Sequence, residues 1–210
     1  MLNPSSKAKP VIGIVGGVGA GKSTVAAEFA AMGCLLVDCD AIGHSLLAEE
    51  SVRERLRRRW GKAVFRPDGG VDRPALAERV FRRPEDLKEL NRIMHPMIRD
   101  RIEESIRRAN EDPSVPAVAI DAAVLFEAGW DDLCSHRVFV QAPEADRLRR
   151  IRTTRGWDTE TWRVRENSQF SLDRKARNCD YTIDNSSSAS YLTEQVRGIF
   201  HRIVHDVERP

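Results

Sequence analysis

The chain has 210 residues, 41% of them hydrophobic and 31% charged, and carries a formal net charge of +2. This composition is typical of a globular protein with one domain, or with one core and a small appendage. The charge gives no indication of a nucleic-acid partner, and no apolar run approaches the roughly 18 residues that cross a bilayer. The four cysteines, at positions 34, 39, 134 and 179, lack the CxxC spacing of zinc and redox sites. We therefore expect neither a nucleic-acid nor a membrane partner, and we expect a reducing, cytoplasmic location.

The first predicted elements are a strand, a helix and a second strand. The apolar run 11–15 predicts a buried strand, residues 23–32 show helical spacing, and residues 34–37 predict the next strand. A βαβ unit of about 30 residues requires parallel strands. The sequence therefore predicts an α/β fold built on a parallel sheet with flanking helices. Residues 1–9, which precede it, are polar, and we expect a flexible tail there.

Two helical segments interrupt the remaining strands. Residues 45–114 are strongly charged and contain a glycine turn, and residues 144–178 are rich in arginine. We interpret the first segment as a helical insertion and the second as a lid, both within a single domain that spans residues 10–210. No long apolar stripe is left unassigned, so a monomer is the default. The predicted core comprises residues 10–44, 115–143 and 179–207. Its later strands are expected over 116–120, 137–140 and 181–183, and its terminal helix over 189–207.

The most specific motif is a glycine-rich loop between the first strand and the first helix. The segment Gly16-Gly17-Val18-Gly19-Ala20-Gly21-Lys22-Ser23 fits the pattern GxxxxGK[ST] without a mismatch. Such a loop turns its backbone N–H groups toward a phosphate, and the helix N-terminus adds a favourable dipole. We expect Lys22 to reach the β- and γ-phosphates of ATP and Ser23 to ligate Mg²⁺. The alternative, a glycine turn with an incidental Lys-Ser, is disfavoured because motif and context agree.

Two acids follow the second predicted strand. The ends of parallel strands point to the ligand crevice in such sheets, and alternation along an extended chain predicts Asp38 and Asp40 on one side. We expect Asp40 to act as the base that orients the acceptor hydroxyl, with Asp38 supporting it or the metal ion. For each aspartate the alternative is a helix N-cap, because a helical pattern begins at Ala41.

Two further acids follow the third predicted strand. Asp121 ends that strand, as a Walker-B acid does, and is expected to bind Mg²⁺ through water; the alternative is a turn or cap residue. Glu127 is a candidate for contact with the acceptor, and a solvated loop glutamate is an equal alternative.

The lid region carries a cluster of arginines at positions 147, 149, 150, 152, 155, 163 and 165. A charge run usually marks a solvated helix face, but acids are comparatively few among these arginines. Arginines on a mobile lid can close over a triphosphate and neutralise developing charge. We expect one or two of them to act directly, with Arg150 and Arg155 preferred and Arg165 third, and the rest to lie at the surface.

Taken together, several separate segments resemble the dephospho-coenzyme A kinase family. The phosphate loop is followed by a Val-Asp-x-Asp segment at 37–40, and later by the Leu-Phe-Glu segment at 125–127. The other matching segments are the Asp-Gly-Gly-Val-Asp-Arg turn at 68–73, the His-Pro segment at 91–98, the Gln…Lys segment at 169–175 and the Asp-x-x-Ile-x-Asn segment at 180–185. The resemblance covers about residues 11–200.

This resemblance implies a P-loop fold like that of nucleoside monophosphate kinases, with a helical acceptor-binding insertion and a helical lid. It implies transfer of the ATP γ-phosphoryl group to the 3′-hydroxyl of dephospho-CoA, the last step of coenzyme A biosynthesis. It also implies that Asp40 is the base and that Asn185 lies beside the nucleotide base, where the alternative is a turn residue. His95 would lie in the acceptor site, where the alternative is a histidine at a helix entry before Pro96. The ATP phosphates would be held by Gly17, Val18, Gly19, Ala20, Gly21, Lys22, Ser23 and Thr24.

The chain departs from the family pattern at a few positions. Val15 stands where the family often has Thr, and Ala123-Val124 replaces Pro-Leu. Glu166 replaces an apolar residue after Arg165, and Cys179 replaces a common Ala. These changes affect packing and loop stiffness more than they affect the reaction class.

Three other functions fit parts of the sequence less well. A kinase for a nucleoside monophosphate or shikimate would share the helical insertion, but the later motifs favour dephospho-CoA. A GTPase-like switch would carry an Asn/Thr-Lys-x-Asp segment, which the sequence lacks. A degenerate nucleotide binder is disfavoured because Lys22, Ser23 and Asp40 are intact.

Overall fold

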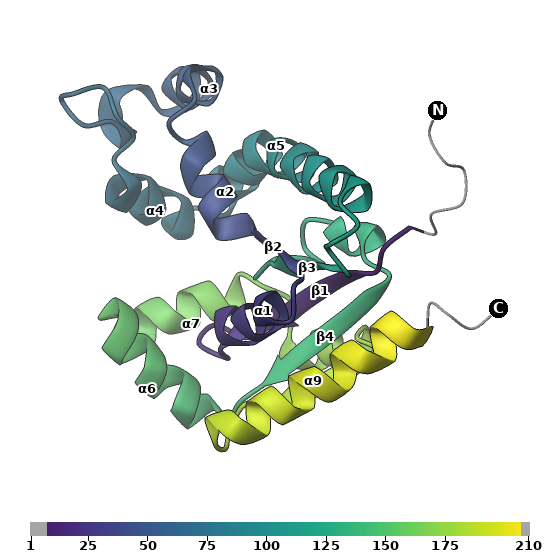
Figure 1. Cartoon of the computed structure of the whole chain (residues 1–210). Helices are drawn as coiled ribbons and strands as arrows, with labels where there is room; N and C mark the ends of the chain where they lie inside the picture. The colour runs from purple at the N-terminus through teal and green to yellow at the C-terminus, as the bar shows by residue number, and fades with distance from the viewer. Residues whose placement is uncertain (1–7, 207–210) are drawn as a thin grey trace, which may run out of the picture. The chain divides into compact units, whose positions relative to one another are not determined.

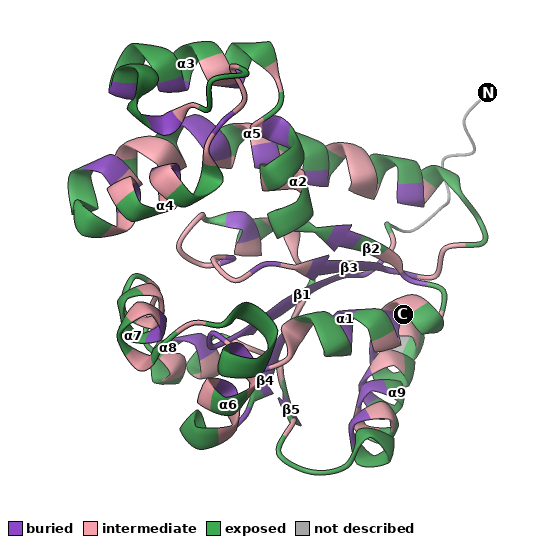
Figure 2. Ribbon diagram, turned by 90° about the vertical axis from the view of Figure 1, so that its left-hand side faces the viewer, coloured by how far each residue is buried: buried purple, intermediate pink, exposed green. Residues whose placement is uncertain are grey.

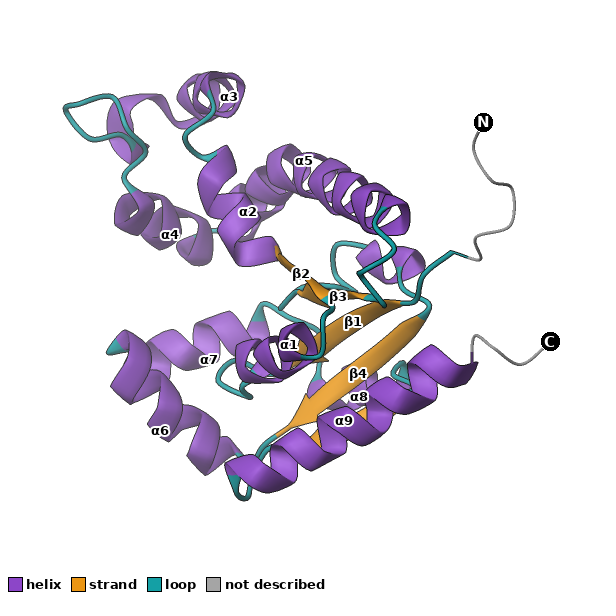
Figure 3. Ribbon diagram, in the orientation of Figure 1, coloured by secondary structure: helices purple, strands orange, loops and turns teal. Residues whose placement is uncertain are grey.

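A computed structural model describes residues 8–206 of the chain and places their strands in one five-stranded sheet (Figure 3). The strands are β1 (Val11–Gly16), β2 (Leu35–Asp38), β3 (Val118–Asp121), β4 (His136–Gln141) and β5 (Tyr181–Asp184). Their order is β2-β3-β1-β4-β5, and β1 pairs in parallel with both β3 and β4. The predicted strands and the parallel sheet are thus confirmed, with boundaries that shift by one or two residues.

The central strand β1 is buried along its whole length, because both faces of the sheet are covered. One face packs against α1 (Lys22–Ala31) and α9 (Ala189–Asp206), and α9 runs along the sheet beside β4 in Figure 1. Apolar side chains of these two helices, including Phe29 and Val196, join Ile12 and Ile14 in one cluster. On the other face, a Cβ added at Gly13 would lie 2.6 Å from a Leu125 carbon, so that face is closely packed as well. Figure 2 shows this core as the buried strands between the helices.

Three helices occupy the region predicted to be a lid. They are α6 (Glu144–Arg155), α7 (Thr159–Asn167) and α8 (Leu172–Arg177). A smaller apolar cluster forms among these helices, in which Ile151 of α6 and Trp162 of α7 enclose Val18 of the glycine-rich loop. The short 3₁₀ helix η2 (Trp130–Leu133) follows β3.

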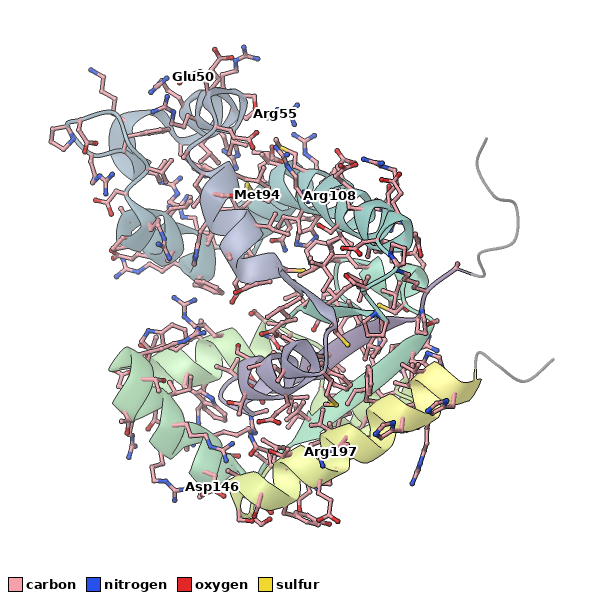
Figure 4. All side chains as sticks on the ribbon, viewed as in Figure 1. Glu50, Arg55, Met94, Arg108, Asp146 and Arg197 are labelled. Atoms are coloured by element: carbon pink, nitrogen blue, oxygen red, sulfur yellow. The ribbon has the colours of Figure 1, made fainter. Side chains whose placement is uncertain are left out.

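Residues 38–102 form a separate helical unit, which is described here by itself. It contains α2 (Cys39–Leu46), α3 (Glu50–Trp60), the 3₁₀ helix η1 (Gly61–Val64), α4 (Arg73–Arg82) and the first part of α5 (Pro84–Glu111). On α3, Glu50 and Arg55 are exposed, whereas Met94 of α5 is buried (Figure 4). The predicted helical character of this segment is confirmed.

One buried carboxylate ties three parts of this unit together. Asp86 of α5 is 1% exposed and accepts hydrogen bonds from Trp60 Nε1 at 2.9 Å, Arg59 Nη2 at 2.9 Å and Arg79 Nε at 2.8 Å. The Trp60 hydrogen bond, followed by that of Arg79, lowers the pKa of Asp86, although desolvation acts in the opposite direction. A buried acid of this kind is stable only because each of its oxygens has a donor.

The start of the described chain is held by the end of α5. Lys9 donates from its backbone N–H to Asn110 Oδ1 at 3.0 Å and from Nζ to the carbonyl of Ala109 at 2.6 Å. The predicted tail otherwise falls on residues 1–7, which lie outside the described residues. Within residues 8–206, no helix combines the length and the apolar character needed to cross a bilayer.

Candidate active site

The glycine-rich loop has the geometry of a phosphate cradle. Gly21 is the N-cap of α1 and has a φ of 91°, a left-handed conformation that favours glycine. A Cβ at this position would also collide with the side-chain amide of Asn185. Lys22 folds back over the loop, with its Nζ 3.3 Å from the Gly16 carbonyl and 3.2 Å from the Gly17 carbonyl. The ammonium group and the first N–H groups of α1 therefore lie at one end of the loop, where a phosphate would be stabilised.

Next to the loop, a hydroxyl and a carboxylate meet. Ser23 Oγ donates a hydrogen bond to Asp121 Oδ2 at 2.7 Å. Asp121 is the last residue of β3, and its neighbour in the parallel register is Ile14 of β1. The pairing of β3 with β1 thus brings this acid to the first turn of α1. Hard oxygen ligands of this type suit Mg²⁺, which commonly keeps several waters and takes one or two protein ligands. These residues fit the expected ion.

Asn185 and Arg150 hold the loop through its carbonyl groups. Asn185 Nδ2 donates to the Ala20 carbonyl at 2.8 Å, and Arg150 donates to the Ala20 carbonyl at 3.2 Å. Arg150 also donates to the backbone carbonyl of Asn185 at 2.7 Å. Both side chains therefore shape the backbone of the phosphate loop, and the catalytic role of Arg150 stays a prediction.

The two other preferred arginines meet at an aromatic ring. The guanidinium groups of Arg155 and Arg165 lie 4.9 and 4.1 Å from the ring centre of Trp157. Burial lowers the pKa of the Arg165 guanidinium, and the neighbouring charge of Arg155 lowers it further. Two cations near each other on a partly buried surface would be stabilised by an anion between them. A phosphate-binding role for the pair stays a prediction.

Glu127 is held in place by a buried lysine. Its Oε1 lies 3.1 Å from Lys175 Nζ and accepts a hydrogen bond from the Phe170 N–H at 2.6 Å. Lys175 is 1% exposed and also donates to Gln169 Oε1 at 2.7 Å and to the Ala123 carbonyl at 2.8 Å. The Glu127 side chain is only 13% exposed, so the alternative of a solvated loop glutamate is wrong. The sequence analysis named this lysine only as the last residue of the Gln…Lys segment at 169–175, because nothing local shows that it is buried beside Glu127.

The proposed geometry of Asp38 and Asp40 needs a correction. The extended chain ends at Asp38, whose carboxylate caps α2 by accepting from the Ala41 N–H at 2.9 Å. Cys39 and Asp40 already belong to the helix, so the alternation of an extended strand does not apply to them. The N-cap alternative is therefore confirmed for Asp38, and Asp40 lies in the first turn instead. Both residues belong to the helical unit, where their roles toward an acceptor remain predictions.

The environment of His95 also differs from one of the expectations. His95 and Pro96 lie inside the 28-residue helix α5, not at its start. The helix-entry alternative for His95 is therefore wrong. Proline usually interrupts a helix, because it lacks an N–H and clashes with the preceding turn. Here the flanking residues Ile93 and Ile98 are buried, and their packing supports the helix through this position.

Comparisons with known proteins identify the family of this chain. The family model described as dephospho-CoA kinase matches residues 10–190. A dephospho-CoA kinase of Corynebacterium diphtheriae is 36% identical over 199 residues, which is 94% of this chain and 99% of that protein. The chain belongs to the dephospho-CoA kinase family.

Two further similarities extend over most of the chain. A dephospho-CoA kinase of Dehalococcoides mccartyi is 35% identical over 84% of this chain and 88% of its own length. The crystal structure of TT1252 from Thermus thermophilus matches with a TM-score of 0.79 at 32% identity, covering 93% of this chain and 98% of that chain. The dephospho-CoA kinase family also accounts for the order of the later motifs, which the competing kinase and switch functions did not explain.

Arg147 is the lid residue whose burial was predicted wrongly. It was expected at the surface with most of the lid arginines, but it is 4% exposed and paired with Glu166. Its guanidinium lies 5.0 Å from the ring centre of Trp162. The sequence did contain one signal for a buried arginine. Two tryptophans, Trp157 and Trp162, lie among the lid arginines, and guanidinium groups commonly stack on such rings.

Proposed function

We propose that this protein transfers the γ-phosphoryl group of ATP to the 3′-hydroxyl of dephospho-CoA, the last step of coenzyme A synthesis. As a member of the dephospho-CoA kinase family, it is an ATP-dependent phosphotransferase. One observation carries the proposal: Lys22 lies on the phosphate loop beside the Ser23–Asp121 pair, in a chain that this family matches over residues 10–190. We propose that the enzyme works in the cytoplasm as a monomer.

The phosphate loop is assigned to ATP. Residues 17–24 surround the phosphates, and the Lys22 ammonium neutralises the β- and γ-phosphates. Asn185 and Arg150 bind carbonyl groups of the loop and its surroundings, Glu166 binds the Val18 N–H, and the Gly17 carbonyl binds the Ala20 N–H, so that the other N–H groups of the loop are left for the nucleotide. Arg150 and Arg155, with Arg165 as the third candidate, stabilise the charge that develops on the transferred group. Ser23 and Asp121 would hold the Mg²⁺ ion, which neutralises phosphate charge when it is bound.

The acceptor is assigned to four other side chains. Asp40 takes the proton of the attacking hydroxyl, and Asp38 supports it from the helix cap. His95 and Glu127 contact the acceptor. Glu127 suits this role because its Oε2 is buried and has no hydrogen-bond partner within the described part of the chain. A ligand donor at this oxygen would remove the cost of an unsatisfied acceptor.

A coupled assay of ADP release tests the proposal. The purified protein is incubated with ATP and Mg²⁺, alone and with dephospho-CoA, AMP or shikimate. We expect ADP release to depend on dephospho-CoA, with coenzyme A formed in equal amount. If only AMP or shikimate stimulates ADP release, the protein is still a kinase, but dephospho-CoA is not its acceptor. The Lys22→Ala variant is the control for a contaminating kinase, because it retains the rest of the site.

A further inference from the structure

Val18, in the middle of the phosphate loop, has both of its backbone polar groups bound by side chains of α7. Its N–H donates to Glu166 Oε2 at 2.7 Å, and its carbonyl accepts from Trp162 Nε1 at 3.1 Å. Its side chain packs in the small cluster with Ile151 and Trp162. The two peptide groups on either side of the Val18 Cα are therefore each fixed in orientation by one residue of the lid region, the Gly17–Val18 peptide by Glu166 and the Val18–Gly19 peptide by Trp162.

A buried ion pair supports the carboxylate that holds the Gly17–Val18 peptide. Glu166 Oε1 pairs with Arg147 Nη1, and the two side chains are 17% and 5% exposed. The Arg147 guanidinium also lies over the Trp162 ring. The pair leaves no room for a side chain at the preceding loop position, since a Cβ at Gly17 would collide with Arg147 and lie 3.0 Å from Glu166 Oε1. Loop and ion pair are thus fitted to one another.

A carboxylate beside a phosphate site needs a positive charge that compensates it. A lone carboxylate would repel a triphosphate, and its burial would be costly. The Arg147 guanidinium compensates that charge, so the Val18 N–H gains an acceptor without a net negative charge beneath the loop. A glycine-rich loop loses much conformational entropy when it becomes ordered. A loop that is already ordered binds its ligand with a smaller entropic loss.

We propose that Glu166 is a positioning residue for nucleotide binding: through Val18 it holds the phosphate loop in its binding shape before ATP arrives. This inference rests on the proposed function of the loop. Arg147 acts through Glu166 by compensating its charge. The acceptor oxygen at position 166, and not the ion pair as such, sets the affinity for ATP.

Two double variants separate these roles. In R147M/E166Q the buried charges are gone, but the glutamine oxygen still accepts from the Val18 N–H. In R147M/E166M the shape and neutrality are the same, but the acceptor is missing. Neither variant leaves a buried charge without its partner, which is the change that would otherwise unfold the region.

The measured quantities are the Kd for ATP without acceptor, by calorimetry, and the steady-state KM and kcat. We expect the Kd and KM for ATP to be about tenfold higher in R147M/E166M than in R147M/E166Q. The KM for dephospho-CoA and the kcat of the two variants should agree within about threefold, since residue 166 touches neither acceptor nor reacting phosphoryl. Thermal midpoints that agree within a few degrees exclude a difference in folding.

Equal Kd values in the two variants would overturn the proposal, because the acceptor oxygen would then be dispensable. A lower Kd in the methionine variant would overturn it too, and would show that the carboxylate competes with phosphate. If the methionine variant does not fold, amide hydrogen exchange of Val18 in the nucleotide-free wild type decides: slow exchange supports the proposal, and an unprotected amide overturns it. Turnover of the wild type with dephospho-CoA tests the proposed function separately.

Discussion

The phosphate loop and the helical unit of residues 38–102 use polar side chains in opposite ways. At the loop, side chains bind the backbone: Asn185 and Arg150 hold the Ala20 carbonyl, and Glu166 holds the Val18 N–H. In the helical unit, side chains bind one another around the carboxylate of Asp86. The first arrangement fixes the shape of a backbone that must receive a ligand, whereas the second joins helices that are already formed. Changes at the loop should therefore alter ATP binding, and changes at Asp86 should alter stability.

The largest effect is expected from Lys22→Ala. Because the proposed role of the ammonium group is to neutralise the ATP phosphates, its loss should lower kcat/KM for ATP by on the order of 10⁴ and also weaken ATP binding. Steady-state kinetics and calorimetry with ATP give the two quantities. The thermal midpoint should be unchanged, because Lys22 is partly exposed and bonds to loop carbonyls. An unchanged affinity for ATP would contradict the assignment of this lysine.

In the helical unit, the corresponding test is the Asp40→Asn variant. Loss of the proposed base should lower kcat by about 10³ while the Kd for ATP stays close to that of the wild type. Asp38→Asn is the matched control, since asparagine caps a helix as well as aspartate does. A wild-type rate for Asp38→Asn would limit that residue to its capping role. Equal loss of ATP affinity in Asp40→Asn and Lys22→Ala would contradict the base assignment.

Two arginine variants distinguish charge stabilisation from loop shaping. Arg165→Ala should lower kcat by about 10² with little change in the KM for ATP, because its proposed role is to stabilise charge in the transition state. Arg150→Ala should lower kcat as well, but should also raise the KM for ATP, since Arg150 holds the carbonyls of Ala20 and Asn185. If Arg150→Ala keeps the wild-type kcat, another arginine stabilises the charge on the transferred group.

The smallest effect on catalysis is expected from Asp86→Asn. Because hydrogen bonds from Trp60 and then Arg79 lower the pKa of Asp86 below its ordinary value of 3.8, the ionised form stabilises the fold above that pH. This contribution is lost as the pH falls through the lowered pKa. The variant should therefore melt about 5 °C below the wild type at pH 7, and the difference should shrink at pH 3. Calorimetric scans at both pH values measure it, and a difference that grows toward acid pH would contradict the sign.

Much of this protein follows from its sequence, because the relevant signals are local. The five strands and their flanking helices are visible as apolar runs and helical spacing, and the GxxxxGK[ST] segment indicates the loop and predicts the roles of Lys22 and Ser23. The position of Asp121 at a strand end also predicted a metal-binding acid, and its hydrogen bond to Ser23 agrees with that role.

The remaining features were decided by tertiary structure. Seven arginines in the lid region look alike in the sequence, yet Arg147 is buried under the loop while Arg155 and Arg165 lie on Trp157. The difference depends on which side chains from distant segments surround each arginine, and desolvation cannot be inferred from spacing along one helix. The same holds for Lys175 beneath Glu127 and for Glu166 beneath Val18, whose partners lie 48 and 148 residues away in the chain. Local patterns determined where the loop lies, and long-range burial decided which side chains hold it in shape.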